Sequence, residues 1–85
     1  MEDQLVIQET IKQFILKTSY SSEEQVSNDT LIFAQGIMDS MGFISIIDFI
    51  EETFSVTAND SELLDTNFES INAITKFVMN KMNQN

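Results

Sequence analysis

The 85-residue sequence predicts an all-α bundle with three main helices and one short helix, forming a single domain over residues 1–85. Two observations indicate helices: apolar residues repeat with the 3.6-residue helical period in three segments, and the chain contains no proline. Runs with the strict alternation typical of strands are scarce. A chain of this length has a thin core, because small domains bury only about 60 % of the surface that the unfolded chain exposes.

The first helix is predicted over residues 3–18. Polar Gln, Glu and Lys residues separate its apolar positions, which recur at helical spacing: Leu5, Ile7, Ile11, Phe14 and Ile15. The polar run over residues 18–22 ends this helix, because Ser and Thr side chains compete for backbone hydrogen bonds.

A long connection over residues 19–38 follows and shows no sustained period. The pattern at residues 22–25 favours one capped helical turn within it. Leu31, Ile32 and Phe33 are too apolar for a solvated loop, so we expect the connection to pack onto the core. Connections of this length inside small domains are usually functional.

The second helix is predicted to begin at Asp39 and Ser40, after the break that Gly36 makes. Asp and Ser are both favoured N-cap residues. The buried stripe of this helix consists of Phe43, Ile46, Ile47, Ile50 and Phe54, with Ile44 and Phe49 widening it. We expect the helix to end near Ser55.

Two further helices are predicted in the remaining chain. Asp60 and Ser61 begin a short helix over residues 62–65, and Ser70 caps the last helix. The apolar stripe of the last helix consists of Ile71, Ile74, Phe77, Val78 and Met82. Five phenylalanines are expected to face the core: Phe14, Phe33, Phe49, Phe54 and Phe77.

Charge is distributed unevenly along the chain. There are 14 acidic residues against four lysines, which gives a formal net charge of −10, and the lysines lie only at positions 12, 17, 76 and 81. Eleven acidic residues and no basic residue occur between positions 18 and 75. Nucleic-acid phosphate and anionic membranes repel such a chain, so we expect protein partners with basic docking patches and no nucleic acid. A solvated acidic face that only aids solubility is the alternative.

The composition argues against a self-contained enzyme. Cys and His are absent, which removes thiol nucleophiles, zinc-thiolate sites and the commonest general base. The adjacent carboxylates Glu51 and Glu52 do not face each other on a helix, so they do not form a catalytic pair. A calcium-binding loop beginning at Asp65 would require Glu at its twelfth position, where Lys76 stands.

The sequence shows no targeting signal. Residues 1–4 are acidic where a signal peptide is basic. No apolar run approaches the ~18 residues that a membrane span needs. We therefore expect a cytoplasmic monomer without a membrane span.

The stretch over residues 36–43 holds the residue best placed for chemistry. Ser40 falls in the first turn of a predicted helix, where free backbone N–H groups and the helix dipole favour negative charge. That position suits a phosphate ester on the Ser40 hydroxyl. On the residues alone, the alternative that Asp39 and Ser40 merely cap the helix stays open.

The tripeptide Asp39-Ser40-Met41 resembles the modification site of acyl carrier proteins, in which Asp-Ser-Leu or Asp-Ser-Met opens the second of four helices. The helix exit at residues 51–56 and the segment over residues 67–74 also resemble that family in register. So do the positions that are buried on the family's second helix, namely Ile44, Ile47, Ile50 and Phe54. The resemblance covers essentially the whole chain and implies an acyl-carrier-like four-helix bundle.

The resemblance implies that a separate phosphopantetheinyl transferase moves phosphopantetheine from coenzyme A onto Ser40, with Asp39 helping to hold the divalent metal during transfer. The thiol of this arm then carries an acyl or aminoacyl group as a thioester, and the chain itself catalyses nothing. The implied partners are an acyl- or aminoacyl-activating ligase and synthase or acyltransferase enzymes, which dock on the second helix. The docking residues expected there are Asp39, Met41, Phe43, Asp48, Glu51 and Glu52.

Some positions depart from the family pattern. Gly42 stands where many fatty-acid carriers have an acidic residue, and Ser45 where many have Glu. The run over residues 36–42 is closer to D-alanyl carrier proteins and other stand-alone specialised carriers, whereas residues 68–77 do not favour the D-alanyl class. Fatty acyl, polyketide and amino-acid cargoes all stay open, and the aromatic core favours short or polar cargo. An unmodified acidic helical adaptor is the alternative from a different class.

Overall fold

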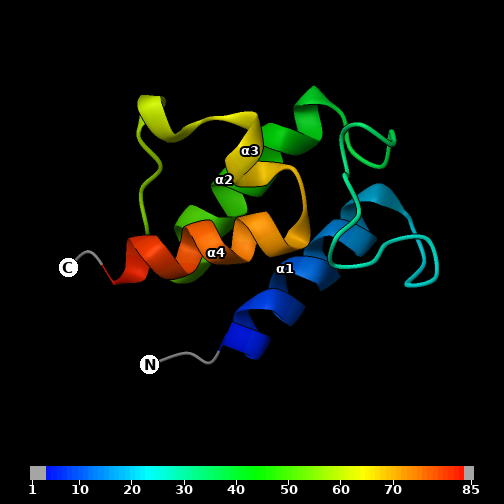
Figure 1. Cartoon of the computed structure of the whole chain (residues 1–85), viewed down its shortest axis with the longest axis horizontal. Helices are drawn as coiled ribbons and strands as arrows, with labels where there is room; N and C mark the ends of the chain where they lie inside the picture. Colours follow the sequence, from blue (N-terminus) through cyan, green and yellow to red (C-terminus); the bar gives the residue numbers. More distant parts are fainter. Residues whose placement is uncertain (1–3, 84–85) are drawn as a thin grey trace.

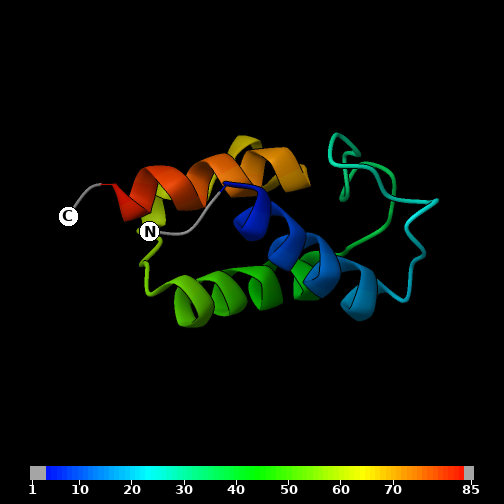
Figure 2. The same ribbon diagram turned by 90° about the horizontal axis from the view of Figure 1, so that it is seen from below.

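A computed structural model describes residues 4–83, and every regular element in this range is helical. The elements are α1 (Gln4–Ser19), α2 (Ser40–Phe54), the 3-10 turn η1 (Asp60–Glu62), α3 (Asp65–Phe68) and α4 (Ile71–Met82). α4 packs against the other three helices, and α1 runs in the opposite direction to α2 and α4 (Figures 1 and 2). The predicted all-α bundle of three main helices and one short helix is confirmed.

The core is a continuous cluster of aliphatic side chains from the three long helices. Its fully buried members include Ile7, Ile11, Ile15, Ile46, Ile50, Ile71, Ile74 and Val78. These positions follow the stripes predicted from the sequence. Within residues 4–83, none of the helices combines the length and the apolar character that a membrane crossing requires.

Two residues assigned to the stripes are exposed instead. Leu5 is 69 % exposed and Ile44 is 54 % exposed. Each lies two positions before a fully buried isoleucine, Ile7 or Ile46. Two helical residues that are two positions apart point about 200° away from each other, so both cannot face the same core.

The connection between α1 and α2 lies against the bundle, as expected. Ile32 is fully buried and Phe33 is half-buried, although Leu31 points outward, contrary to the prediction. The Ile32 N–H donates a hydrogen bond of 3.0 Å to the Glu69 carbonyl, which ties the connection to the segment before α4. Residues 22–25 form a hydrogen-bonded turn rather than the helical turn that was predicted.

The prediction for the short helix is wrong by three residues: it was expected over residues 62–65 and lies at Asp65–Phe68. Residues 60–62 form η1, and the α-helical turn begins at Asp65 rather than ending there. Burial gives the physical reason: Phe68 is fully buried and anchors α3, whereas Leu64 is exposed. The α-helical turn therefore forms over residues 65–68, where it directs the Phe68 side chain into the core.

Glu62 connects η1 to α4 through an ion pair. Its carboxylate accepts a hydrogen bond from the Lys81 ammonium at 2.8 Å and another from the Asn59 N–H at 2.9 Å. The hydrogen bond from Lys81, followed by that from Asn59, lowers the pKa of Glu62. This ion pair joins the segment after α2 to the end of α4.

The aromatic residues divide into an inner and an outer group. Phe54 and Phe77 are buried as predicted, whereas Phe14, Phe33 and Phe49 are half-buried at the margin of the core. Phe68, which was not among the five core phenylalanines predicted, is the only fully buried phenylalanine among the described residues. Its burial depends on the placement of α3 against α4, which local periodicity does not reveal.

The two isoleucines at positions 50 and 44 of α2 provide a direct test of this packing. We expect Ile50→Ala to lower the free energy of unfolding by about 2–5 kcal/mol, because it leaves a cavity in a closely packed core. The same truncation at exposed Ile44 should change it by no more than about 0.5 kcal/mol. Denaturant unfolding measures both values, and equal losses would contradict the assignment of the two faces.

Candidate functional site

Asp39 determines where α2 begins. Its backbone is extended (φ −113°, ψ −167°), and its carboxylate accepts a hydrogen bond of 3.0 Å from the Gly42 N–H. The Asp39 carbonyl accepts the Phe43 N–H at 3.0 Å, the first backbone bond of the helix. The predicted N-cap is therefore confirmed, and Asp39 supplies it.

Ser40 is the first residue of α2, and its side chain is exposed. Among the described residues, its hydroxyl has no hydrogen-bond partner. Because Asp39 already caps the helix, the Ser40 hydroxyl is not needed for capping. It stands at the positive end of a 15-residue helix, where an attached phosphate would be stabilised.

Gly42 lets Met38 pack beneath this first turn. A Cβ atom at position 42 would lie 2.8 Å from the Met38 methyl group and 3.2 Å from its Cβ. Met38 is buried, so a larger residue at position 42 would have to displace it. Gly42, which stands where many fatty-acid carriers have an acidic residue, thus leaves room for the Met38 side chain.

A hollow of about 580 Å³ opens beside Ser40. It lies between the N-terminal turn of α2, the end of the long connection and the start of α3. Its lining residues are Phe33, Gly36, Met38, Asp39, Ser40, Phe43 and Asp65. The hollow therefore combines an apolar floor with two carboxylates, directly next to the exposed hydroxyl.

The six residues named for docking do not share one face of α2. Met41 is 71 % exposed, and Asp48 and Glu52 are also exposed. Half-buried Phe43 instead packs edge-on against other rings, and the Glu51 carboxylate accepts the Ala58 N–H at 2.9 Å.

Ile44 belongs to the exposed face of α2, although sequence reasoning placed it in the core. It is three residues after Met41 and four before Asp48, so the three side chains lie on one side of the helix. The sequence signal that could have found it is the helical phase: Ile44 is two positions, or about 200°, from Ile46, which the predicted stripe already places in the core.

The residues around Ser40 do not form a complete metal site. Within residues 4–83, no group of three or more His, Cys, Asp or Glu side chains could hold a metal ion. Asp39 uses one carboxylate oxygen, Oδ1, for the helix cap. Any divalent metal held there would need further ligands from a partner.

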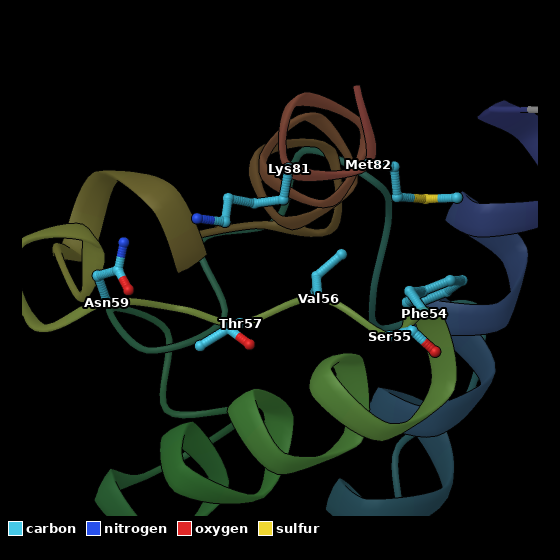
Figure 3. A pocket seen from close by; sticks show the side chains of 7 residues that line it. All are labelled: Phe54, Ser55, Val56, Thr57, Asn59, Lys81 and Met82. Atoms are coloured by element: carbon cyan, nitrogen blue, oxygen red, sulfur yellow. The ribbon is translucent and has the colours of Figure 1, made fainter. Parts of the chain in front are cut away.

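A second hollow, of about 420 Å³, lies at the opposite end of α2 (Figure 3). Its lining residues are Phe54, Ser55, Val56, Thr57, Asn59, Lys81 and Met82. The Lys81 side chain extends towards the side of the hollow on which Asn59 lies, and its ammonium is engaged with Glu62. Because its only charged side chain already has a partner, this hollow offers no comparable chemistry.

A sequence comparison identifies the family of this chain. A family profile described as "Phosphopantetheine attachment site" matches residues 9–78, which is more than half of the chain. The chain therefore belongs to this family of phosphopantetheine-carrying proteins, as its resemblance to acyl carrier proteins implied. No curated protein matches the chain.

Membership of this family defines the prosthetic group, a covalently attached phosphopantetheine. The exposed Ser40 hydroxyl at a helix N-terminus, beside an open hollow, fits such a group. Carrier domains of this kind interact with modifying and synthase enzymes and are in general non-catalytic.

Substitutions at Asp39 separate its capping role from its charge. Asp39→Ala should lower the free energy of unfolding by about 0.5–2 kcal/mol, because it removes the N-cap. Asn is an equally good N-cap residue, so Asp39→Asn should keep most of that stability. Thermal or denaturant unfolding tests this, and equal destabilisation by both variants would show that Asp39 acts through its charge.

Proposed function

We propose that Ser40 is the phosphopantetheine attachment residue and that this protein is an acyl carrier. The observation that carries the proposal is the exposed Ser40 hydroxyl, which has no hydrogen-bond partner within the described residues and stands in the first turn of α2. When attached, the group supplies a thiol that holds an acyl group as a thioester. The chain holds and presents that cargo to biosynthetic enzymes and does not itself catalyse a reaction.

The eight other serines are less suited to modification. Ser45 is half-buried within α2, and Ser55 follows the C-terminal end of α2, where the helix dipole disfavours an attached phosphate. Ser70 is buried and its hydroxyl accepts the Ala73 N–H at 3.1 Å, so it serves as the N-cap of α4. Ser61 is exposed but lies within the three-residue turn η1. Local hydrogen bonds engage the hydroxyls of Ser19, Ser21, Ser22 and Ser27.

Asp39 supports the transfer of the group in this proposal. Its Oδ1 atom is held by the Gly42 N–H, which fixes the orientation of the carboxylate beside Ser40. We assign its second oxygen to the divalent metal that the transferase brings. Asp39→Asn should therefore be loaded more slowly than wild type although it keeps the cap.

An aminoacyl carrier is the second candidate, and the charge of the hollow favours it. Asp39 and Asp65 border this space. The ammonium group of an aminoacyl thioester would be attracted to such carboxylates, whereas a fatty acyl group would not. Treating the loaded protein from its own cells with hydroxylamine would release the cargo as a hydroxamate, whose mass distinguishes an acyl group from an aminoacyl group.

The exposed face of α2 is the proposed docking surface, defined by Met41, Ile44, Asp48 and Glu52. Two apolar side chains near Ser40 are followed by two exposed carboxylates. A fitting partner would present an apolar depression bordered by Lys or Arg. Such partners include the transferase, an activating ligase and synthase or acyltransferase enzymes.

The attachment site can be tested by intact mass. Incubation of wild type with coenzyme A, magnesium and a broad-specificity transferase should add one phosphopantetheine group. Ser40→Ala should fold and gain no mass, whereas exposed Ser61→Ala should still be loaded. Absence of loading in wild type with several active transferases, or peptide mapping to another serine, would refute the assignment.

The docking surface can be tested by charge reversal. Asp48→Lys combined with Glu52→Lys should reduce the association rate with the transferase about tenfold or more at low salt and flatten its salt dependence. Glu23→Lys combined with Glu24→Lys makes the same change of charge outside α2 and serves as the control. Glu51 is left intact because its carboxylate holds the Ala58 N–H. Equal effects of the two double variants would show that only net charge matters.

A further inference from the structure

We propose that a column of four phenylalanine rings closes the interior of this protein to the cargo of the arm. Phe43 is the residue that keeps the acyl cargo outside the core. This inference rests on the proposed attachment at Ser40.

The four rings contact one another in series from the surface into the core. The ring centroids are 5.8 Å apart for Phe33 and Phe43, 5.4 Å for Phe43 and Phe68, and 5.0 Å for Phe68 and Phe77. These separations lie within the range of direct aromatic contact. Phe68 is fully buried and Phe77 is buried, so the column ends deep in the core.

Phe43 stands where a cargo attached through Ser40 would enter. It is three residues after Ser40, so the two side chains lie on neighbouring positions of one helix face. Phe43 is half-buried and lines the same hollow as Ser40, with Phe33 as a second aromatic wall. Phe68 lies directly behind Phe43. A chain turning inward from the hollow would therefore meet the Phe43 ring first.

An alkyl chain would have to separate these rings to pass between them. Carbon atoms in van der Waals contact lie about 3.5–4.0 Å apart, so an inserted methylene would require each ring pair to open by a similar distance. Behind them lie fully buried aliphatic residues, and overpacking a close-packed core is unfavourable. The hollow outside can take a short group against Phe33 and Phe43, whereas a longer chain would extend from it into water.

The dependence of stability on acyl length tests the proposal. A transferase can load the acetyl and octanoyl forms of the arm from the corresponding coenzyme A thioesters, and the melting temperature of each product is then measured. In a domain of this size, each methylene buried in the interior would raise that temperature by about 3–6 °C. We expect the acetyl and octanoyl forms of wild type to melt within about 2 °C of each other, since the cargo stays outside.

Removal of the Phe43 ring should open the interior. In Phe43→Ala, the octanoyl form should melt on the order of 10 °C above the acetyl form, because methylenes fill the vacated space. Phe49→Ala is the matched control: it removes a half-buried ring from the same helix, but one that stacks on Phe14 of α1 at 4.1 Å. In this variant, the acetyl and octanoyl forms should differ in melting temperature as little as they do in wild type. Phe43→Leu is the milder variant to use if the alanine variant does not fold.

The outcomes separate this proposal from the attachment proposal. No mass gain from any coenzyme A thioester would reject attachment. A second outcome is that wild type loads normally but its octanoyl form melts on the order of 10 °C above its acetyl form. That result would support attachment and would overturn the exclusion of the cargo from the core. Identical length dependence in Phe43→Ala and wild type would overturn the role assigned to Phe43.

Discussion

The hydrogen bond from the Gly42 N–H to the Asp39 carboxylate fixes the start of α2, and the functional geometry depends on that start. A helix turns about 100° per residue, so a change of one residue in helical phase would rotate every side chain of α2 by that angle. Ile46 and Ile50 would then leave the core, and Ser40 would no longer stand in the exposed first turn. The cap at Asp39 is thus in register with the buried face of α2, and this register leaves the Ser40 hydroxyl exposed.

The long connection before α2 supplies the other wall of the site. It is held down by buried Ile32, whose carbonyl accepts the Met38 N–H at 2.9 Å and whose own N–H reaches the Glu69 carbonyl. Met38 in turn packs beneath Gly42. The hollow beside Ser40 is therefore bordered by segments tied to one another by backbone bonds. Its shape is a property of the whole fold and not of α2 alone.

The acidic residues in the middle of the chain have separate roles, which their sequence positions do not reveal. Glu62 is paired with Lys81 and Glu51 holds the Ala58 N–H, so both carboxylates stabilise the segment after α2. Asp39 holds the first turn of the helix. Asp48 and Glu52 are exposed on α2, which leaves them available to a basic partner. In the proposed docking, net charge attracts basic partners and the exposed carboxylates further along α2 from Ser40 define where they bind.

The sequence by itself determined the number and order of the helices, the cap at Asp39 and the place of Ser40, because these depend on short-range periodicity and on side chains that bond their own backbone. Only the tertiary structure decided which apolar residues are buried: Ile44 and Leu31 are exposed and Phe68 is buried. The burial of such a side chain depends on which element packs against it, and a local pattern does not specify that neighbour. The tertiary structure also placed the short α-helix at Asp65–Phe68, where Phe68 is buried, whereas the local turn signal at Asp60 gives only the 3-10 turn η1. The roles of Glu51 and Glu62 likewise follow from partners brought close by folding, which a local sequence pattern does not encode.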